Sequence, residues 1–161
     1  MTSAASRQRP SSGNKPVPND VWYAQAGLRF ACTQCGACCK RPGFVYLTRH
    51  EGDRIAERLL GPDADADTLM GELWVEDEDG LLVIDVPEKA TCPLLGPSGC
   101  TVHDIKPMQC ASYPFWPEIL GSERKWKAEK KHCEGINDAA EAYSADDVMQ
   151  ILSLRRRTRN C

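Results

Sequence analysis

The most informative stretch of the sequence is Cys32-Thr33-Gln34-Cys35-Gly36-Ala37-Cys38-Cys39. Two Cys-x-x-Cys steps run together in it and end in an adjacent pair of cysteines. A Cys-x-x-Cys step suits chelation, because a tight turn brings both sulfurs to one ion at about 2.3 Å and turn amides can hydrogen-bond the thiolates. Gly36 permits the positive φ that such a turn uses. The stretch therefore predicts a metal site built from thiolates.

Neighbouring cysteines such as Cys38 and Cys39 point in different directions in most backbone conformations, so we expect them to serve two sites rather than one ion. Later cysteines would supply the remaining ligands. Eight thiols suffice for two tetrahedral four-sulfur sites, or for one iron-sulfur cluster plus extra thiols. We expect Cys161 to be spare. The predicted metal ligands are Cys32, Cys35, Cys38, Cys39, Cys92, Cys100, Cys110 and Cys133.

Composition favours a small globular protein. The 161 residues are 42% apolar and 27% charged, which suits one domain with a modest core. The net charge of -3 argues against a nucleic-acid partner. No apolar run is long enough to cross a membrane and residues 1–20 lack the apolar core of a signal peptide, so we expect a cytoplasmic protein.

That location bears on the cysteines. Stable disulfides are rare in a reducing cytoplasm, and the nine cysteines cannot all pair with one another. Metal ligation or thiol chemistry should explain them. The expected partner is a metal ion, with a protein partner left open and neither nucleic acid nor membrane expected.

Helix signals occur at two places. Thr48 and Glu51 form a capping-box pattern that predicts a helix over residues 49–60, stopped at Gly61. Ser144, followed by apolar residues at helical spacing, predicts a second helix over residues 144–161. We therefore divide the chain into a solvated tail at 1–20, a cysteine-cluster metal-binding domain at 21–143 and a C-terminal helix at 144–161.

Strand signals are shorter. Residues 28–32 and 43–48 have strand composition, and residues 73–75 and 81–86 flank an Asp79-Gly80 turn typical of an antiparallel hairpin. Residues 92–117 are dense in Pro and Gly and predict irregular loops. The expected fold class is a small, irregular α+β domain stapled by metal, with a short antiparallel sheet and two or more helices.

Three blocks resemble a known family. They are Phe30-x-Cys32-x-x-Cys35-x-x-Cys38-Cys39, then Cys92-Pro-Leu-Leu with Gly99-Cys100-Thr-Val-His103, then Pro107-x-x-Cys110 with Tyr113-Pro114-Phe115. Together, over roughly Leu28 to Cys133, they resemble the YkgJ-type cysteine cluster family of zinc- or iron-chelating domains. The resemblance implies metal chelation. Lys106 and Ala111 stand where the family tends to have arginine, so a role of those arginines is not carried over.

Ligand chemistry leaves zinc and iron open as cofactors. The run matches the first three ligands of a bacterial ferredoxin motif, but Cys39 follows Cys38 directly. The alternatives are an iron-sulfur protein with a redox or enzymatic role, and a thiol-redox sensor. We expect His103 and His132 to lie beside the thiolates without ligating, and His50 to be on the surface. No catalytic residues can be assigned. Whether the protein is an enzyme stays open, although the sequence favours a protein that is not one.

Overall fold

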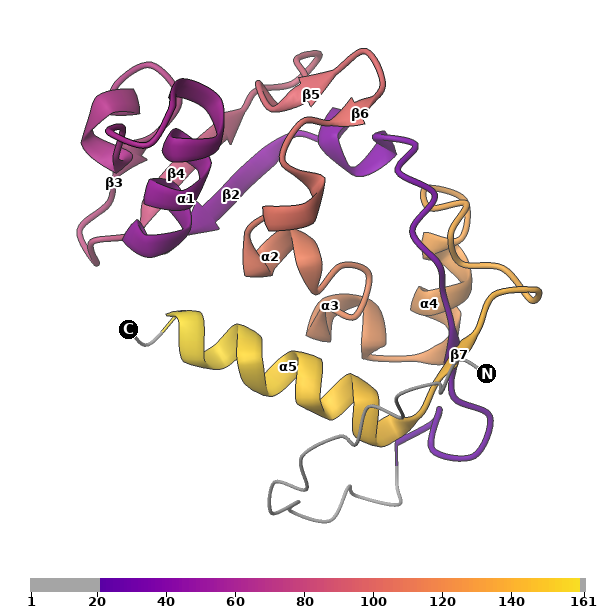
Figure 1. The fold of residues 1–161 in the computed structure, drawn as a ribbon. Helices are drawn as coiled ribbons and strands as arrows, with labels where there is room; N and C mark the ends of the chain where they lie inside the picture. Colours follow the sequence, from indigo (N-terminus) through magenta and orange to yellow (C-terminus); the bar gives the residue numbers. More distant parts are fainter. Residues whose placement is uncertain (1–20, 160–161) are drawn as a thin grey trace, which may run out of the picture.

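A computed structural model describes residues 21–159, with side chains up to residue 156. Short antiparallel sheets and several helices give an α+β fold, which confirms the expected class (Figure 1). The predicted tail at residues 1–20 and Cys161 lie outside the described residues. No helix in the described range is both long and apolar enough to cross a membrane.

The largest sheet has three antiparallel strands in the order β2-β4-β3. They are β2 (Gly43–Leu47), β4 (Leu82–Val86) and β3 (Val75–Glu76). Strands β3 and β4 form the predicted hairpin, whose turn is closed by the Asp77 N–H donating to the Leu81 carbonyl at 2.8 Å. Gly80 adopts φ 77 there, a conformation that glycine enters without strain.

Strand β2 lies at the edge of this sheet, and its free side is occupied by one side chain. The Gln109 carboxamide donates to the Phe44 carbonyl at 2.8 Å and accepts the Tyr46 N–H at 3.0 Å. It thus takes the place of a neighbouring strand's peptide group. Gln109 belongs to the short helix α2 (Met108–Ala111).

Helix α1 (Arg49–Leu60) matches the predicted helix. The predicted capping box is present, since the Thr48 hydroxyl accepts the Glu51 N–H and the Glu51 carboxylate accepts the Thr48 N–H. The helix ends at Gly61, where φ is 111. Its buried face includes Ile55 and Gly52 and packs on the sheet.

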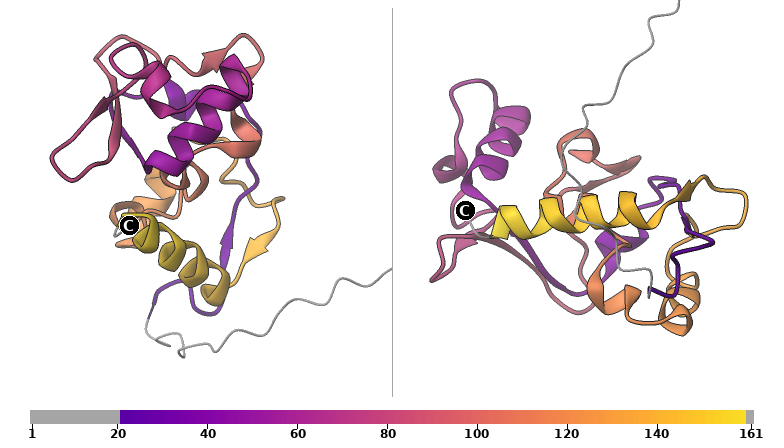
Figure 2. Two further views of the ribbon diagram at one scale, coloured as in Figure 1. Left: turned by 60° about the vertical axis from the view of Figure 1, so that its left-hand side comes forward. Right: turned by 90° about the horizontal axis from the view of Figure 1, so that it is seen from below.

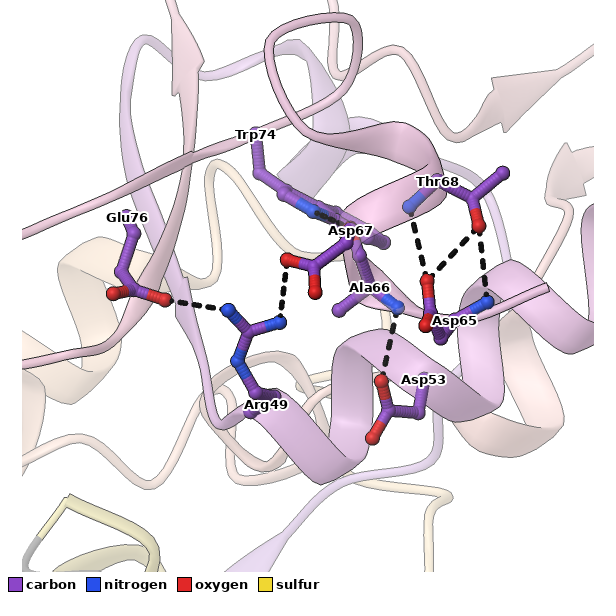
Figure 3. A network of polar contacts seen from close by, with 8 residues as sticks. All are labelled: Arg49, Asp53, Asp65, Ala66, Asp67, Thr68, Trp74 and Glu76. Carbon is purple, nitrogen blue, oxygen red and sulfur yellow. Dashed lines mark hydrogen bonds and ion pairs between the residues drawn. The ribbon is translucent and has the colours of Figure 1, made fainter.

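An acidic segment after α1 is tied back to that helix (Figure 3). The Arg49 guanidinium donates to Asp67 at 2.8 Å and to Glu76 at 2.9 Å. The Asp53 carboxylate accepts the Ala66 N–H at 2.9 Å, at the start of the 3-10 helix η2 (Ala66–Leu69). These carboxylates serve local structure and lie apart from the cysteines.

The cysteine-bearing middle of the chain consists of short pieces, as its Pro and Gly content predicts. They are η1 (Ala37–Lys40), β5 (Leu95–Gly96), β6 (Gly99–Cys100), η3 (His103–Ile105), α2 and α3 (Pro117–Leu120). Strands β5 and β6 pair as a small antiparallel hairpin. Few ladder hydrogen bonds hold this region.

The two ends of the described chain together form a second structural unit. Strand β1 (Leu28–Arg29) pairs with β7 (Ala142–Tyr143), and α4 (Glu123–Glu129) follows α3. The strand predicted over residues 28–32 is shorter than expected, because the Ala31 N–H bonds to the Gly135 carbonyl of an irregular loop instead of a strand. Helix α5 (Ala145–Arg159) lies within the helix predicted over residues 144–161, of which residues 160 and 161 are outside the described range.

Helix α4 was not predicted from the sequence. Its Trp126 and Glu129 are buried. Both lie on one side of α4, with the lysines left on the exposed side. A single buried aromatic among many charges gives too weak a periodic signal to predict this helix.

Two hydrophobic clusters result. The first includes Leu47, Ile55, Trp74, Leu82 and Val102, and the second includes Leu28, Phe115, Trp126, Val148 and Leu152. In Figure 1 and in the left view of Figure 2, α1 and α5 lie at opposite ends of the molecule with α2 and α3 between them. The cysteine-bearing segments lie where the two clusters meet.

A substitution at Gly52 tests how closely α1 packs on the sheet. Replacing it with alanine raises intrinsic helix propensity by up to ~1 kcal/mol, but the added Cβ would overlap the Leu82 side chain and press on Ala66. We expect Gly52→Ala to lower the free energy of unfolding by about 1–3 kcal/mol through overpacking. The measurement is urea denaturation at matched metal content.

The exposed α1 residue Arg54 provides a matched control. Arg54→Ala should leave the urea midpoint almost unchanged. A Gly52→Ala midpoint equal to or above that of the wild type would contradict the close approach of α1 to β4.

Candidate metal centre

All eight cysteines predicted as ligands line one cavity of about 330 Å³. The cavity lies at the junction of the two hydrophobic clusters, since Cys92 is a buried member of the first and Cys133 of the second. The cysteines come from well-separated stretches of chain. The fold therefore brings together the thiols that the sequence singled out.

Four of these thiols form one group, called here the inner thiols: Cys38, Cys39, Cys92 and Cys100. Backbone bonds hold them, because the Cys92 N–H donates to the Cys39 carbonyl at 2.7 Å and Cys100 pairs with Leu95 in the β5–β6 hairpin. The Cys39 thiol interacts with the thiols of Cys100, Cys38 and Cys92. Adjacent Cys38 and Cys39 thus lie in one group of thiols, and the expectation that they serve two metal sites stays a prediction.

The four inner thiols differ in their pKa values. Hydrogen bonding with Cys39 lowers the pKa of Cys38 and of Cys100 to about 6 and that of Cys92 to about 7. The same interactions raise the pKa of Cys39. One S–H serves one acceptor at a time, so the Cys39 proton stabilises one of these three sulfurs as a thiolate at any moment. Thiolates are the form that binds metal.

Cys110 lies beside this group on α2. Burial, and then the charges of Cys38, Cys92 and Cys100, raise the pKa of Cys110 to about 12. Its thiol is therefore neutral next to the inner thiols. A cation entering the cavity would reverse this, since positive charge favours the thiolate.

The remaining cysteines, called here the outer thiols, are Cys32, Cys35 and Cys133. The turn carrying Cys35 has φ 60 at Gln34 and φ 72 at Gly36, where a Cβ would lie 2.7 Å from Leu95 Cδ1. Positive φ at Gly36 agrees with the turn expected for a Cys-x-x-Cys step. Cys32 and Cys35 are exposed, while Cys133 is buried.

A tight backbone contact brings Cys133 to this turn. The Ala31 N–H donates to the Gly135 carbonyl at 2.9 Å, and a Cβ on Gly135 would lie 2.5 Å from the Ala31 carbonyl oxygen. Only glycine fits there. The charges of Cys35 and Cys133 interact as a result, although burial is the main cause of the raised pKa of Cys133.

A buried polar group forms the wall next to Cys133. The Tyr113 hydroxyl donates to the Glu129 carboxylate at 2.6 Å, and Arg41 forms an ion pair with the same carboxylate. Burial and the bond to Glu129 raise the pKa of Tyr113, and the Tyr113 hydroxyl also interacts with the Cys133 thiol. The sequence analysis missed Glu129, because its partners lie 16 and 88 residues away.

Histidines and a lysine complete the lining. His103 Nε2 lies 3.4 Å from Cys32 Sγ, and Lys106 Nζ lies 3.2 Å from the same nitrogen. Burial and the Lys106 charge lower the pKa of His103, so its ring is neutral. His132 also lines the cavity, whereas His50 lies exposed on α1, as predicted.

The donor set suits a thiophilic metal. Within the described range, no three His, Cys, Asp or Glu side chains are arranged to hold a metal ion as they stand. A cysteine sulfur is placed by one torsion with three staggered positions, and the exposed Cys32, Cys35 and Cys38 have room to turn. The Lys106 ammonium interacts with Cys38, Cys100 and Cys110, so positive charge is already drawn to the sulfurs.

Comparison with known proteins gave one match. The model of the CxxCxxCC family, described as "Putative zinc- or iron-chelating domain", matches residues 31–134. This range begins just before Cys32 and ends just after Cys133, so it contains every cysteine that lines the cavity. No curated protein and no solved structure matches the chain.

The proton sharing can be tested on the metal-free chain. Ultraviolet thiolate absorbance should rise with a component centred between pH 6 and pH 7, below the ordinary cysteine pKa of about 8.5. Cys39→Ala should move this component to higher pH, because it removes the shared hydrogen-bond partner.

Cys110→Ala serves as the control, since Cys110 stays protonated over this range and its removal should leave the component in place. A wild-type titration that begins only near the ordinary cysteine pKa would contradict the grouping of the inner thiols.

Proposed function

The chain belongs to the CxxCxxCC family of zinc- or iron-chelating domains, and we propose that it binds its metal through thiolates of the eight cysteines that line the cavity. The observation that carries this proposal is the meeting of eight thiols from distant stretches of chain in one cavity. Soft thiolate ligands select zinc, copper(I) and iron-sulfur clusters over hard cations. The family's metals, zinc and iron, both fall in that group.

The metal would have a structural consequence in this fold. Three of the inner thiols, Cys39, Cys92 and Cys100, pack with the first hydrophobic cluster and Cys133 packs with the second, and short irregular pieces connect them. Bonds from these sulfurs to metal in the cavity would tie the two clusters together. Because the unfolded chain has no preformed site, the binding energy becomes folding energy.

Zinc is our first choice of metal. Four-thiolate zinc sites are tetrahedral and closed, and they commonly stabilise small loop-rich domains. The inner thiols and Cys110 supply the required sulfurs at the partly buried side of the cavity. Lys106, close to several of them, would offset the negative charge left by four thiolates around a divalent ion.

An iron-sulfur cluster is the second candidate. The cavity volume of about 330 Å³ is many times the ~30 Å³ share of one water molecule and leaves space for inorganic sulfide as well as iron. The aromatic side chains of Phe30, Phe44 and Trp116 also line it and would lower the local dielectric. A redox role would follow from this alternative.

Elemental analysis and a visible spectrum of anaerobically purified protein test the metal. We expect stoichiometric zinc and a colourless solution. A brown solution with sulfide-to-iron charge-transfer absorption and matching iron content would instead support the cluster. Protein that contains neither zinc nor iron, with its thiols free or oxidised, would contradict the proposed function.

Single cysteine substitutions test the ligand assignment. Cys35→Ser and Cys110→Ser should each lower the bound metal and the thermal midpoint together, because ligation and folding are coupled. Cys161→Ser is the control, since Cys161 is predicted to be spare, and it should change neither quantity. Unchanged metal content in both ligand variants would show that these thiols are not ligands.

A further inference from the structure

Among the described contacts of the thiols, one joins a cysteine to an imidazole ring. His103 Nε2 lies 3.4 Å from Cys32 Sγ, although 71 residues separate the two in sequence. Both side chains line the cavity. We infer that His103 is itself a metal ligand through Nε2 and that, with the outer thiols Cys32, Cys35 and Cys133, it forms a second ion site with three sulfurs and one nitrogen. This inference rests on the proposed function.

The contact with Lys106 indicates which ring nitrogen is available. An ammonium group has three donors and no acceptor, so Lys106 Nζ can bond to His103 Nε2 at 3.2 Å only when that nitrogen carries a lone pair. A lone pair on Nε2 is what a metal ion needs from imidazole. The lysine cation thus occupies a direction from which a metal cation would approach, and metal binding would displace it.

The outer thiols are positioned to join this nitrogen. Cys32 and Cys35 flank one tight turn, and the bond from the Ala31 N–H to the Gly135 carbonyl fixes the Cys133 loop against that turn. Cys35 and Cys133 already interact through their charges. Three sulfurs and one imidazole give four donors, the usual number for tetrahedral zinc.

The two halves of the cavity therefore differ. Three of the four inner thiols, Cys39, Cys92 and Cys100, pack with the first hydrophobic cluster, whereas two of the three outer thiols, Cys32 and Cys35, are exposed. An ion on the exposed side is easier for water and competing chelators to reach. The outer site would accordingly exchange its metal faster than the inner one.

His132 provides a matched control. It precedes Cys133 in the chain and lines the same cavity, so from sequence it is as good a candidate as His103. The structure separates the two, because the 3.4 Å thiol contact is made by His103. A ligand role thus predicts a loss on substitution of His103 that substitution of His132 does not reproduce.

The test is a Co²⁺ titration of the full-length chain, freed of metal under anaerobic, reducing conditions. The wild type should take up two Co²⁺ ions with tetrahedral d–d bands. His103→Ala should weaken one of them by at least about tenfold, as loss of a metal-site partner typically does, and leave the all-sulfur spectrum of the other. His132→Ala should bind like the wild type.

A third variant separates ligation from a hydrogen bond to Cys32. His103→Cys supplies a sulfur in place of the nitrogen, so it should restore the second Co²⁺ and increase the sulfur-to-cobalt charge-transfer absorption. If His103 only hydrogen-bonded Cys32, the spectrum of this variant would gain no sulfur band.

Several results would overturn the inference: a single Co²⁺ bound by the wild type, unchanged binding by His103→Ala, or no added sulfur band in His103→Cys. Wild-type protein that binds neither Co²⁺ nor zinc nor iron would instead contradict the proposed function itself, so the two failures are distinguishable.

Discussion

Ionised thiols confined to one cavity repel one another, and positive charge placed among them is what can hold the surrounding loops together. Eight cysteines line a space at the junction of two hydrophobic clusters. The segments between the clusters have few ladder hydrogen bonds. Repulsion between thiolates thus falls in the part of the fold that has few ladder hydrogen bonds.

The protein's own cationic side chains offset this repulsion between thiolates only in part. The Lys106 ammonium lies close to Cys38, Cys100 and Cys110. The Arg41 guanidinium forms an ion pair with the buried Glu129 carboxylate, so its charge is largely neutralised by that partner. A divalent ion among the sulfurs would supply the positive charge that these side chains do not provide. Chelation, the property described for the family, is consistent with that need.

Local signals in the sequence predicted local structure well. The capping box at Thr48 and Glu51 predicted the exact extent of α1, and the Asp79-Gly80 turn predicted the β3–β4 hairpin, because each depends on neighbours within a few residues. Helix α4 was missed, since its burial depends on where the second cluster lies. Cysteine spacing identified the residues that line the cavity but not their division into inner and outer thiols.

That division depends on contacts between distant segments. Cys39 meets Cys92 through a backbone bond, and Cys32 meets His103 across 71 residues, so no periodicity or motif could reveal either pairing. The burial of Glu129 between Tyr113 and Arg41 has the same origin. The type of candidate ligand can thus be read from the sequence, whereas the grouping of these candidates depends on the fold.

The carboxamide of Gln109 has a consequence for behaviour in concentrated solution. An unpaired edge strand is a template on which a second polypeptide can add and start aggregation, and β2 carries the exposed aromatic rings of Phe44 and Tyr46. Gln109 blocks this edge by imitating a peptide group. Because Cys110 directly follows Gln109 in the chain, an interaction that fixes the Cys110 sulfur would also hold the Gln109 side chain at the edge of β2. The chemistry of this cysteine would in this way affect solubility.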